Sequence, residues 1–317
     1  MPTSLKVFLI CWFTGLGVQF VRRRDPRIVK LLLVSVVCVI GLFVAAFALA
    51  IAGGMTPKYD LWLYKADWVL GSPAYLISRM IVRTPLYVVL VIVYDTMPAV
   101  LLMVYAAHLL CRGIPGRVLA AFALNFGVGL CLYLLLPACG PIYAFPHFPW
   151  VLPPFPELQR LSISAVPNCM PSIHASTALL ALGFCWRWPA VRAAALLNVV
   201  LTLLGTLASG EHYLIDLVVA VPYTAFVYAA VNGHTRSAAA WLALVLAWIA
   251  GLRFGLPWIT PAPLPFACAC VATVVAVVAS TLLHRKPSIA LGDAARLGSP
   301  VDSTRRAESA AATVISR

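Results

Sequence analysis

Charged residues are scarce in this chain, and acidic residues are the scarcest of them. Only 10% of the 317 residues are charged, with 10 Asp and Glu against 23 Lys and Arg. Hydrophobic residues make up 62% of the chain, and its mean hydropathy is +0.96. Soluble domains carry about a quarter charged residues and about half apolar ones, so this composition excludes a water-soluble core.

Two other shortages exclude further classes of protein. The nine cysteines show no paired C-x-x-C spacing, so the sequence predicts no metal site and no cofactor. The basic residues form short clusters between apolar stretches rather than one basic face, so nucleic acid is not an expected partner. The first apolar stretch, residues 5–20, lacks a basic leader and a small-residue cleavage site, which favours a retained helix or an interfacial anchor over a signal peptide.

Apolar stretches recur along the whole chain. A helix needs roughly 20 apolar residues to cross a bilayer. Stretches of this kind occupy residues 5–21, 31–52, 86–110, 117–137, 172–187, 193–209, 213–231, 237–255 and 265–284. The sequence therefore predicts an all-α, polytopic helical membrane protein with about eight or nine spans, embedded in the bilayer.

The charge of the connections predicts which side of the membrane each one faces. If the spans alternate, the basic clusters at residues 22–30, 112–117, 187–192, 236 and 285–286 all fall on one side, which the positive-inside rule makes cytoplasmic. The other side receives three segments: residues 53–85, 138–170 and the turn at 210–212. Between residues 59 and 80, mixed apolar, Trp and Tyr residues favour a helix lying in the interface.

Two histidines begin predicted spans on that outer side. In Met170-Pro171-Ser172-Ile173-His174, the free N–H groups of a first helical turn are suited to hold a phosphate near His174. In the segment from Gly210 to Asp216, a four-residue spacing puts His212 and Asp216 on one helical face. A carboxylate there orients one imidazole as a nucleophile, and His174 can protonate a departing oxygen.

The order of these motifs carries a resemblance to a known family. Pro171-Ser172-x-His174 followed by His212-x-x-x-Asp216 resembles the second and third motifs of the type 2 phosphatidic acid phosphatase superfamily. With Cys139-Gly140-Pro141-Ile142-Tyr143 in the preceding loop, the chain is most similar to the inositolphosphotransferase-like branch, which contains inositol phosphorylceramide synthases and sphingomyelin synthases. The resemblance spans roughly residues 55–231.

This resemblance implies a fold and an activity. It implies a six-helix phosphatase-type core with extra terminal helices, and a membrane lipid phosphatase or phosphotransferase that needs no metal. It further implies that a phosphohistidine forms on His212, that Asp216 orients this histidine, and that His174 protonates the leaving alcohol. By the same resemblance the substrate is expected to be a lipid phosphate or phosphodiester reached from the outer leaflet, and Ser172 and Tyr143 are candidate substrate contacts.

The chain departs from the superfamily at its cationic phosphate ligands. The first motif, a Lys followed after six residues by Arg-Pro, is absent. Arg83-Thr84-Pro85 is only weakly similar to it and lies at a different place in the chain. The Ser-Arg that opens the usual third motif falls on Gly205-Thr206. Since a phosphoryl transition state needs positive partners or oriented N–H groups, Arg79, Arg83 and Arg160 are the candidate replacements.

Two other functions stay open at this point. Asp95 lies inside an apolar span, where it serves either a transporter that uses intramembrane charge or a structural hydrogen bond. The missing cations leave open a catalytically inert scaffold. Cys139 and Cys169 bracket the outer loop as a disulfide or as two free thiols. Glu211 is interpreted as a solvated turn residue, and Tyr213 as part of the aromatic belt.

The resulting division of the chain has four parts. They are an N-terminal helix with a basic cytoplasmic loop (1–30), a catalytic membrane core (31–231), two additional membrane helices (232–284) and a disordered cytoplasmic tail (285–317). The expected location is a bacterial cytoplasmic membrane with the site facing outward. The sequence leaves the oligomeric state open.

Overall fold

The computed structural model describes every residue of the chain except 1, 56, 112, 154–156, 256–262 and 284–317. The tail predicted at 285–317 therefore lies outside the described residues. By contacts the chain divides into two units, Met1–Val274 and Val275–Arg317, and the second is described only to the end of its helix. Within the described part, the one β-type pairing is an isolated bridge between Lys58 and Leu161.

The described residues are mostly helical. The helices are α1 (Thr3–Arg23), α2 (Pro26–Met55), α3 (Asp60–Val69), α4 (Pro73–Ile81), α5 (Pro85–Asp95), α6 (Met97–Leu110), α7 (Pro115–Leu135), α8 (Pro141–Ala144), α9 (Ile173–Cys185), α10 (Pro189–Ala208), α11 (Leu214–Val231), α12 (Thr235–Ala250), the π-helical turn η1 (Gly251–Gly255) and α14 (Pro263–Leu283). Within the described part of the chain, seven helices are long and apolar enough to cross a membrane, or eight spans if the bent pair of α4 and α5 forms one span. The predicted all-α polytopic membrane fold is confirmed.

Two predicted segments differ in the structure. The span expected at 86–110 is interrupted at Thr96, where α5 ends and α6 begins. Pro98 explains the break, because proline is tolerated in the first turn of a helix but disrupts its interior. The interfacial helix expected at 59–80 is two helices, α3 and α4, and the inner face of α3 is buried, with Leu63 and Tyr64 fully covered.

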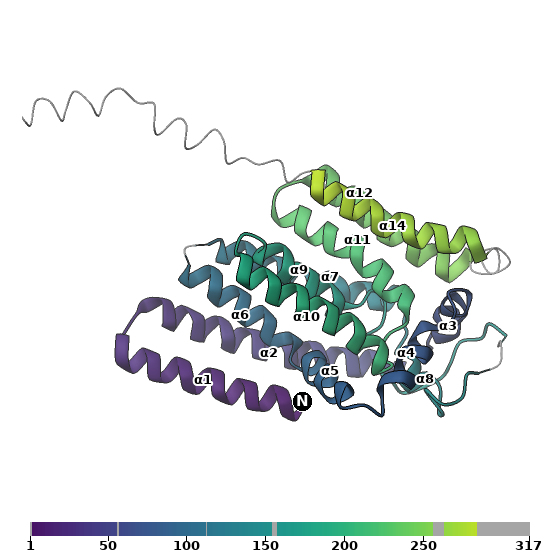
Figure 1. Ribbon diagram of the computed structural model, residues 1–317, viewed down its shortest axis with the longest axis horizontal. Coiled ribbons are helices and arrows are strands. Elements are labelled where there is room, and N and C mark those ends of the chain that lie inside the picture. The colour runs from purple at the N-terminus through teal and green to yellow at the C-terminus, as the bar shows by residue number, and fades with distance from the viewer. Residues whose placement is uncertain (1, 56, 112, 154–156, 256–262, 284–317) are drawn as a thin grey trace, which may run out of the picture. The chain divides into compact units, whose positions relative to one another are not determined.

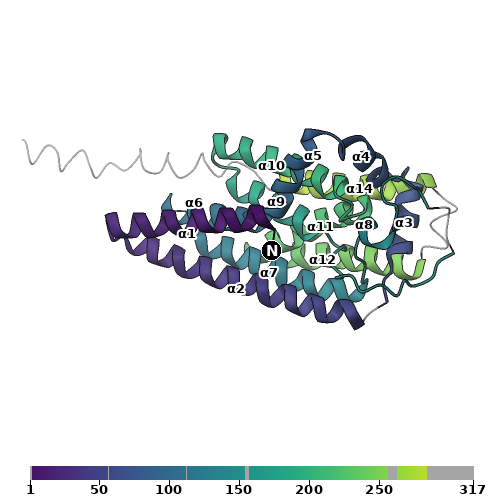
Figure 2. The same cartoon turned by 90° about the horizontal axis from the view of Figure 1, so that it is seen from below.

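Helices α9 and α11 form the centre of the first unit. Helix α9 contacts α6, α7, α10 and α11, and α11 also contacts α3 and α12. Helices α1 and α2 make a hairpin that packs along α5, α6 and α7 (Figures 1 and 2). Helix α11 is also the most buried of the candidate spans, so residues at its start are enclosed by protein rather than by lipid.

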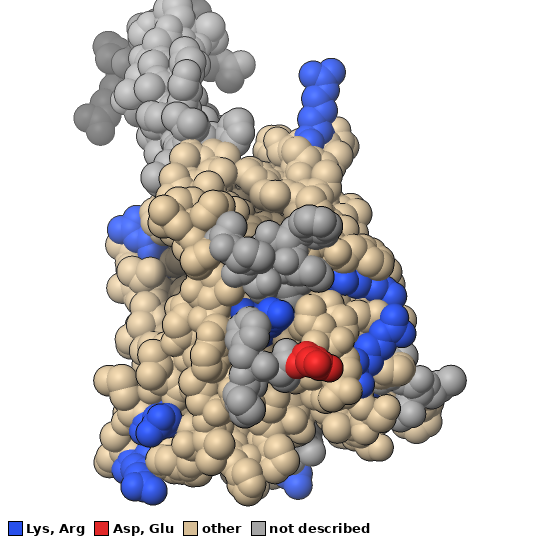
Figure 3. Space-filling view, turned by 90° about the vertical axis from the view of Figure 1, so that its right-hand side faces the viewer, with Lys and Arg blue, Asp and Glu red and all other residues tan. Residues whose placement is uncertain are grey.

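The three segments predicted to share one side meet at one end of this unit. Figure 1 shows α3, α4 and α8 together there. Backbone hydrogen bonds join the segments: Lys58 N donates to Leu161 O at 2.8 Å, and Ile142 N donates to Gly210 O at 3.0 Å. The surface of that end shows more Lys and Arg than Asp and Glu (Figure 3). The starts of α9 and α11 are therefore brought together beneath a covering of loops and short helices.

Candidate active site

Two helix starts carry the histidines, and local capping orders both. Ser172 is the N-cap of α9, and its hydroxyl accepts from Ala175 N at 3.3 Å, which satisfies a donor of the first turn. At α11 the Asp216 carboxylate reaches back to accept from Tyr213 N at 2.8 Å, as a carboxylate at the third helical position does in a capping box. Ser172 N also donates to Asp216 O at 3.4 Å, so the two starts are linked directly.

His212 lies between Asp216 and Ser172 and is fully buried. Its Nδ1 is 3.4 Å from Oδ2 of Asp216, and its Nε2 is 3.1 Å from the Ser172 hydroxyl. The first distance exceeds that of a strong hydrogen bond, and Nδ1 and the second carboxylate oxygen have no hydrogen-bond partner among the described residues. Such contacts are often long before a substrate binds and tighten when charge develops.

His174 faces His212 and is stacked on an aromatic ring. The centroids of the two imidazoles are 6.0 Å apart, with their planes at 63°. The ring of Tyr94 stacks on His174 with a centroid distance of 3.9 Å and an angle of 16°. The Tyr94 hydroxyl is buried without a hydrogen-bond partner in the described structure. Sequence reasoning missed Tyr94, because an aromatic residue in an apolar span looks the same as one that faces lipid.

Cys169 is a direct neighbour of the orienting carboxylate. Its thiol donates to Asp216 Oδ2 at 2.7 Å, and it also lies 3.5 Å from Glu211 O. Burial and the nearby Asp216 charge raise the pKa of the Cys169 thiol far above its ordinary value, so it stays protonated as a donor. Cys139 and Cys169 are both free thiols, which answers the alternative left open by the sequence.

Two buried carboxylates on α3 hold the loops of the site, and the sequence analysis did not identify them. Asp60 accepts from the backbone N–H groups of Cys139 and Gly140, at 3.1 and 2.9 Å, and from the Tyr213 hydroxyl at 3.1 Å. Tyr213 is fully covered rather than part of an aromatic belt. Burial raises the pKa of Asp60 to about 6, and these hydrogen bonds oppose the rise.

Asp67 caps the start of α11. Its two carboxylate oxygens accept from Leu214 N at 3.0 Å and from Ile215 N at 3.1 Å. A carboxylate at this position also suits the positive end of the helix dipole. Burial, with the nearby charge of Asp216, raises the pKa of Asp67 to about 8 against those hydrogen bonds. Asp60 and Asp67 are seven residues apart on one face of α3, a spacing that could have identified them.

Glu211 is partly buried beside the predicted substrate contact Tyr143. The Tyr143 hydroxyl donates to Glu211 Oε1 at 2.8 Å. Burial raises the pKa of Glu211, while Tyr143 and His212 oppose that rise. Glu211 is thus more enclosed than the solvated turn residue expected from the sequence.

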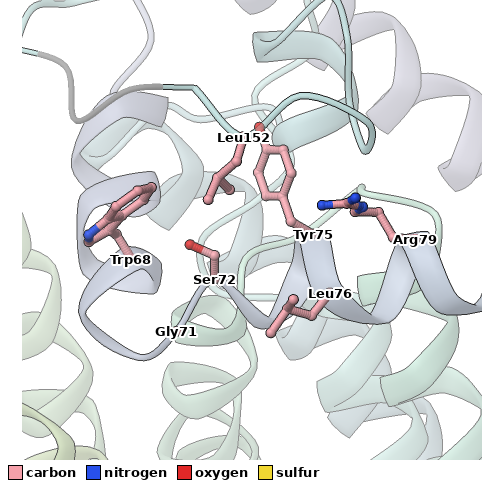
Figure 4. Close-up of a pocket in the computed structure, with 7 residues that line it drawn as sticks. All are labelled: Trp68, Gly71, Ser72, Tyr75, Leu76, Arg79 and Leu152. Carbon is pink, nitrogen blue, oxygen red and sulfur yellow. The ribbon is translucent and has the colours of Figure 1, made fainter.

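The three candidate arginines have contacts of their own in the structure. The Arg83 guanidinium lies over Trp150 at 4.2 Å from the ring centroid, and that of Arg160 lies over Tyr59 at 5.2 Å. Arg79 lines a pocket at the turn between α3 and α4 (Figure 4). Asp95, the candidate for a transporter, accepts from the Ser4 hydroxyl of α1 at 3.3 Å, a contact that joins two helices.

The site also contains donor atoms suited to a metal. The side-chain atoms of Cys169, His212 and Asp216 that can bind a cation lie within 4.8 Å of one another, and all three residues are buried. Thiolate, imidazole and carboxylate together are a set that Zn²⁺ accepts. In this structure the Cys169 thiol and His212 Nδ1 both contact Asp216 Oδ2, so a metal would have to replace these contacts.

The fold and this cluster define a polytopic helical membrane protein with two histidines and a carboxylate gathered at one end of its helical core. The family model of the PAP2 superfamily matches residues 61–231, the part of the chain from α3 to the end of α11. The chain belongs to the PAP2 superfamily. Neither the comparison with curated proteins nor the comparison with solved structures gave a match.

Proposed function

We propose that this protein is a membrane lipid phosphatase or phosphotransferase that forms a phosphohistidine intermediate on His212. Membership of the PAP2 superfamily supports a phosphatase-type activity in general. The single observation that carries the specific proposal is the position of His212, with Asp216 at Nδ1, Ser172 at Nε2 and the ring of His174 6.0 Å away between centroids. A nucleophile, an orienting carboxylate and a proton donor are the parts that such a transfer requires.

The first half of the reaction follows from these contacts. With its proton on Nδ1 and directed at Asp216, His212 presents the lone pair of Nε2, which forms a bond to phosphorus. The phosphorus–oxygen bond to the leaving alcohol breaks, and that oxygen takes a proton from His174. Asp216 stabilises the positive charge that the phosphorylated imidazole acquires.

The second half returns the site to its starting state. His174, now unprotonated, takes a proton from water or from an acceptor alcohol as its oxygen attacks phosphorus. The Nε2–phosphorus bond breaks, and the lone pair returns to Nε2. Water as acceptor gives hydrolysis and an alcohol gives headgroup transfer, so one set of residues supports both outcomes.

Neutral donors near His212 contribute to holding the phosphoryl oxygens. The Ser172 hydroxyl is 3.1 Å from Nε2, where it can turn toward a phosphoryl oxygen, and the start of α9 offers the free N–H groups of a first turn. Tyr143 and the candidate arginines Arg83 and Arg160 remain proposed substrate contacts. The inositolphosphotransferase-like branch, a bacterial cytoplasmic membrane and an outward-facing site are parts of the same proposal.

The experiment that tests the proposal measures two reactions of the detergent-purified protein in EDTA. Phosphate release and headgroup exchange are followed on a panel of lipid phosphomonoesters and phosphodiesters, with His212→Ala and His108→Gln alongside. His108 is the matched control, because it is equally buried but bonds to Phe184 O, away from the pair. Turnover in EDTA that His212→Ala abolishes and His108→Gln retains supports the histidine mechanism. Turnover unchanged in His212→Ala contradicts it.

A further inference from the structure

The turn between α3 and α4 has two faces with different surroundings. On its inner face Asp67 caps α11, and the Ser78 hydroxyl donates to Ala208 O at 2.7 Å, so this face holds both ends of the segment that carries His212. The next residues in sequence, Trp68 and Arg79, line a pocket on the other face (Figure 4). The pocket is therefore formed by the same turn that supports the candidate site.

The pocket is small and combines apolar walls with a few polar groups. It has a volume of about 180 Å³ and is lined by Trp68, Gly71, Ser72, Tyr75, Leu76, Arg79 and Leu152. Pockets for drug-sized molecules are roughly 300–1,000 Å³, so this one accepts only a fragment the size of a headgroup. Figure 4 shows the Arg79 guanidinium directed toward Tyr75 across the pocket.

One buried hydroxyl of the pocket, that of Tyr75, has no hydrogen-bond partner among the described residues. The Tyr75 hydroxyl belongs to a side chain that is 3% exposed, and it makes no hydrogen bond there. The Ser72 side chain makes no capping bond to α4, although Ser72 is the N-cap residue and is nearly buried. Arg79 is exposed and forms no ion pair in the described structure, where carboxylates are few. A buried hydroxyl without a partner, as at Tyr75, indicates a missing polar ligand.

We propose that this pocket binds the phosphate-bearing headgroup of an anionic phospholipid. A guanidinium can only donate hydrogen bonds, and a hydroxyl can donate one. Phosphate oxygens accept hydrogen bonds, so these three groups are complementary to a phosphate. The exposed Leu76 and Leu152 beside the pocket provide an apolar surface for the start of the acyl chains. A headgroup that also carries a positive charge is disfavoured beside Arg79. This binding is separate from the proposed reaction at His212 and does not depend on it.

A lipid bound in this pocket would stabilise the backbone next to His212. A headgroup held by Ser72, Tyr75 and Arg79 fixes the α3–α4 turn from its outer face, while Asp67 and Ser78 hold the catalytic segment on the inner face. Tyr75 also packs on Phe148, with ring centroids 4.8 Å apart, and Phe148 is in contact with Gly210. The lipid therefore steadies the backbone two residues before His212.

The test measures the lipids retained by the full-length protein in native mass spectrometry. The protein is equilibrated in mixed micelles with equal amounts of phosphatidylglycerol and phosphatidylcholine. We expect phosphatidylglycerol to be retained about tenfold over phosphatidylcholine, since one charge-assisted contact accounts for roughly that factor. Arg79→Gln and Tyr75→Phe should each reduce this preference. Arg253→Gln should keep it, because Arg253 lies over Tyr59 and donates to Leu135 O instead of lining the pocket.

Three outcomes overturn the proposal. Equal retention of the two lipids by the wild-type protein removes the headgroup preference on which it rests. An equal loss in Arg79→Gln and Arg253→Gln shows a general effect of surface charge instead of this pocket. Displacement of the lipid by excess inorganic phosphate shows that the pocket binds the free anion. Each readout is independent of turnover, so failure here is distinguishable from failure of the proposed function.

Discussion

The thiol of Cys169 donates a hydrogen bond of 2.7 Å to the same Asp216 oxygen that lies 3.4 Å from His212 Nδ1. The carboxylate that orients the proposed nucleophile is thus itself held by a buried cysteine. Losing a hydrogen bond to a buried charged group costs about 1–3 kcal/mol. We expect Cys169→Ala to lower turnover by about tenfold, with a smaller loss in Cys169→Ser, which keeps a donor.

Cys139 provides the control for this prediction. It is also buried, and its thiol donates to Asp60 at 3.4 Å rather than to Asp216. Initial rates of both cysteine variants are compared at saturating and limiting substrate. A Cys169→Ala enzyme with wild-type kcat, or one no more impaired than Cys139→Ala, contradicts a positioning role for Cys169.

Zn²⁺ should inhibit the protein through the same three residues. The donor atoms of Cys169, His212 and Asp216 lie within 4.8 Å of one another, and a bound ion would occupy one imidazole nitrogen and the carboxylate that orients His212 in the proposed reaction. We expect Zn²⁺ to inhibit turnover reversibly, with EDTA restoring it. Cys169→Ala should raise the inhibitory concentration by about tenfold or more, because one of three ligands is lost. Equal Zn²⁺ sensitivity in wild type and variant contradicts binding at this place.

Asp216→Asn tests the orienting role directly. Asparagine keeps the shape of the side chain but removes the charge that fixes the tautomer of His212, and in comparable catalytic groups this change lowers kcat by about 10³–10⁴-fold. We expect a loss of that order in turnover with little change in KM. A loss confined to KM indicates that Asp216 acts in substrate binding instead.

Tyr94 should act on His174 through its ring more than through its hydroxyl. The stacked rings, 3.9 Å apart, fix the orientation of the proposed proton donor. Tyr94→Phe keeps the stack and should cost only a few-fold in kcat, whereas Tyr94→Leu loses it and should cost about tenfold. Tyr87→Leu, on the same helix α5, is the control. Equal losses in Tyr94→Phe and Tyr94→Leu place the effect on the hydroxyl.

The membrane fold and the paired histidines could be predicted from sequence for a physical reason. Long apolar stretches are needed to cross a bilayer, and a four-residue spacing puts His212 and Asp216 on one face wherever a helix forms. The family match over residues 61–231 agrees with the superfamily inferred from these motifs. The assignment of catalytic roles to the three residues remains a prediction.

The contacts that hold the site could not be predicted in the same way. Asp60 and Asp67 look like charges in a mixed outer segment, and only the fold brings them to Gly140 and to the start of α11. Their partners are backbone N–H groups, which leave no signature in the sequence. The break between α5 and α6 did have a signal, Pro98, but its effect is hidden by the continuous apolar stretch on both sides.

Gly140 should be far less tolerant of a side chain than Gly71. Both have positive φ, +92° and +88°, so alanine strains the backbone at either position. At Gly140 the added Cβ would lie 2.3 Å from Glu211 O, whereas at Gly71 nothing lies within 4 Å. We expect Gly140→Ala to reduce the free energy of unfolding by at least about 2 kcal/mol more than Gly71→Ala. Similar thermal melting of the two variants in detergent contradicts the close packing of residues 140 and 211.

Asp67 should make the stability of the protein depend on pH. Burial raises its pKa to about 8 in the folded protein, above the roughly 3.9 of an unfolded chain. The folded state therefore binds this proton more tightly, so the group's contribution is fully present below about pH 4 and is lost as pH rises through about 8. We expect the melting temperature to fall between about pH 6 and pH 9, a window above the pKa of Asp60.

Asp67→Asn should flatten that dependence. Asparagine keeps an oxygen that can accept from Leu214 N or Ile215 N, but it carries no charge to bury as the pH rises. Asp25→Asn is the control, because Asp25 is partly exposed and pairs with Arg27 on the surface. Melting curves are recorded for the three proteins at each pH in one detergent. If the melting temperature of Asp67→Asn falls with pH as steeply as that of wild type, another group titrates in this window. The protonation state of Asp67 would then be the same at every pH of the series.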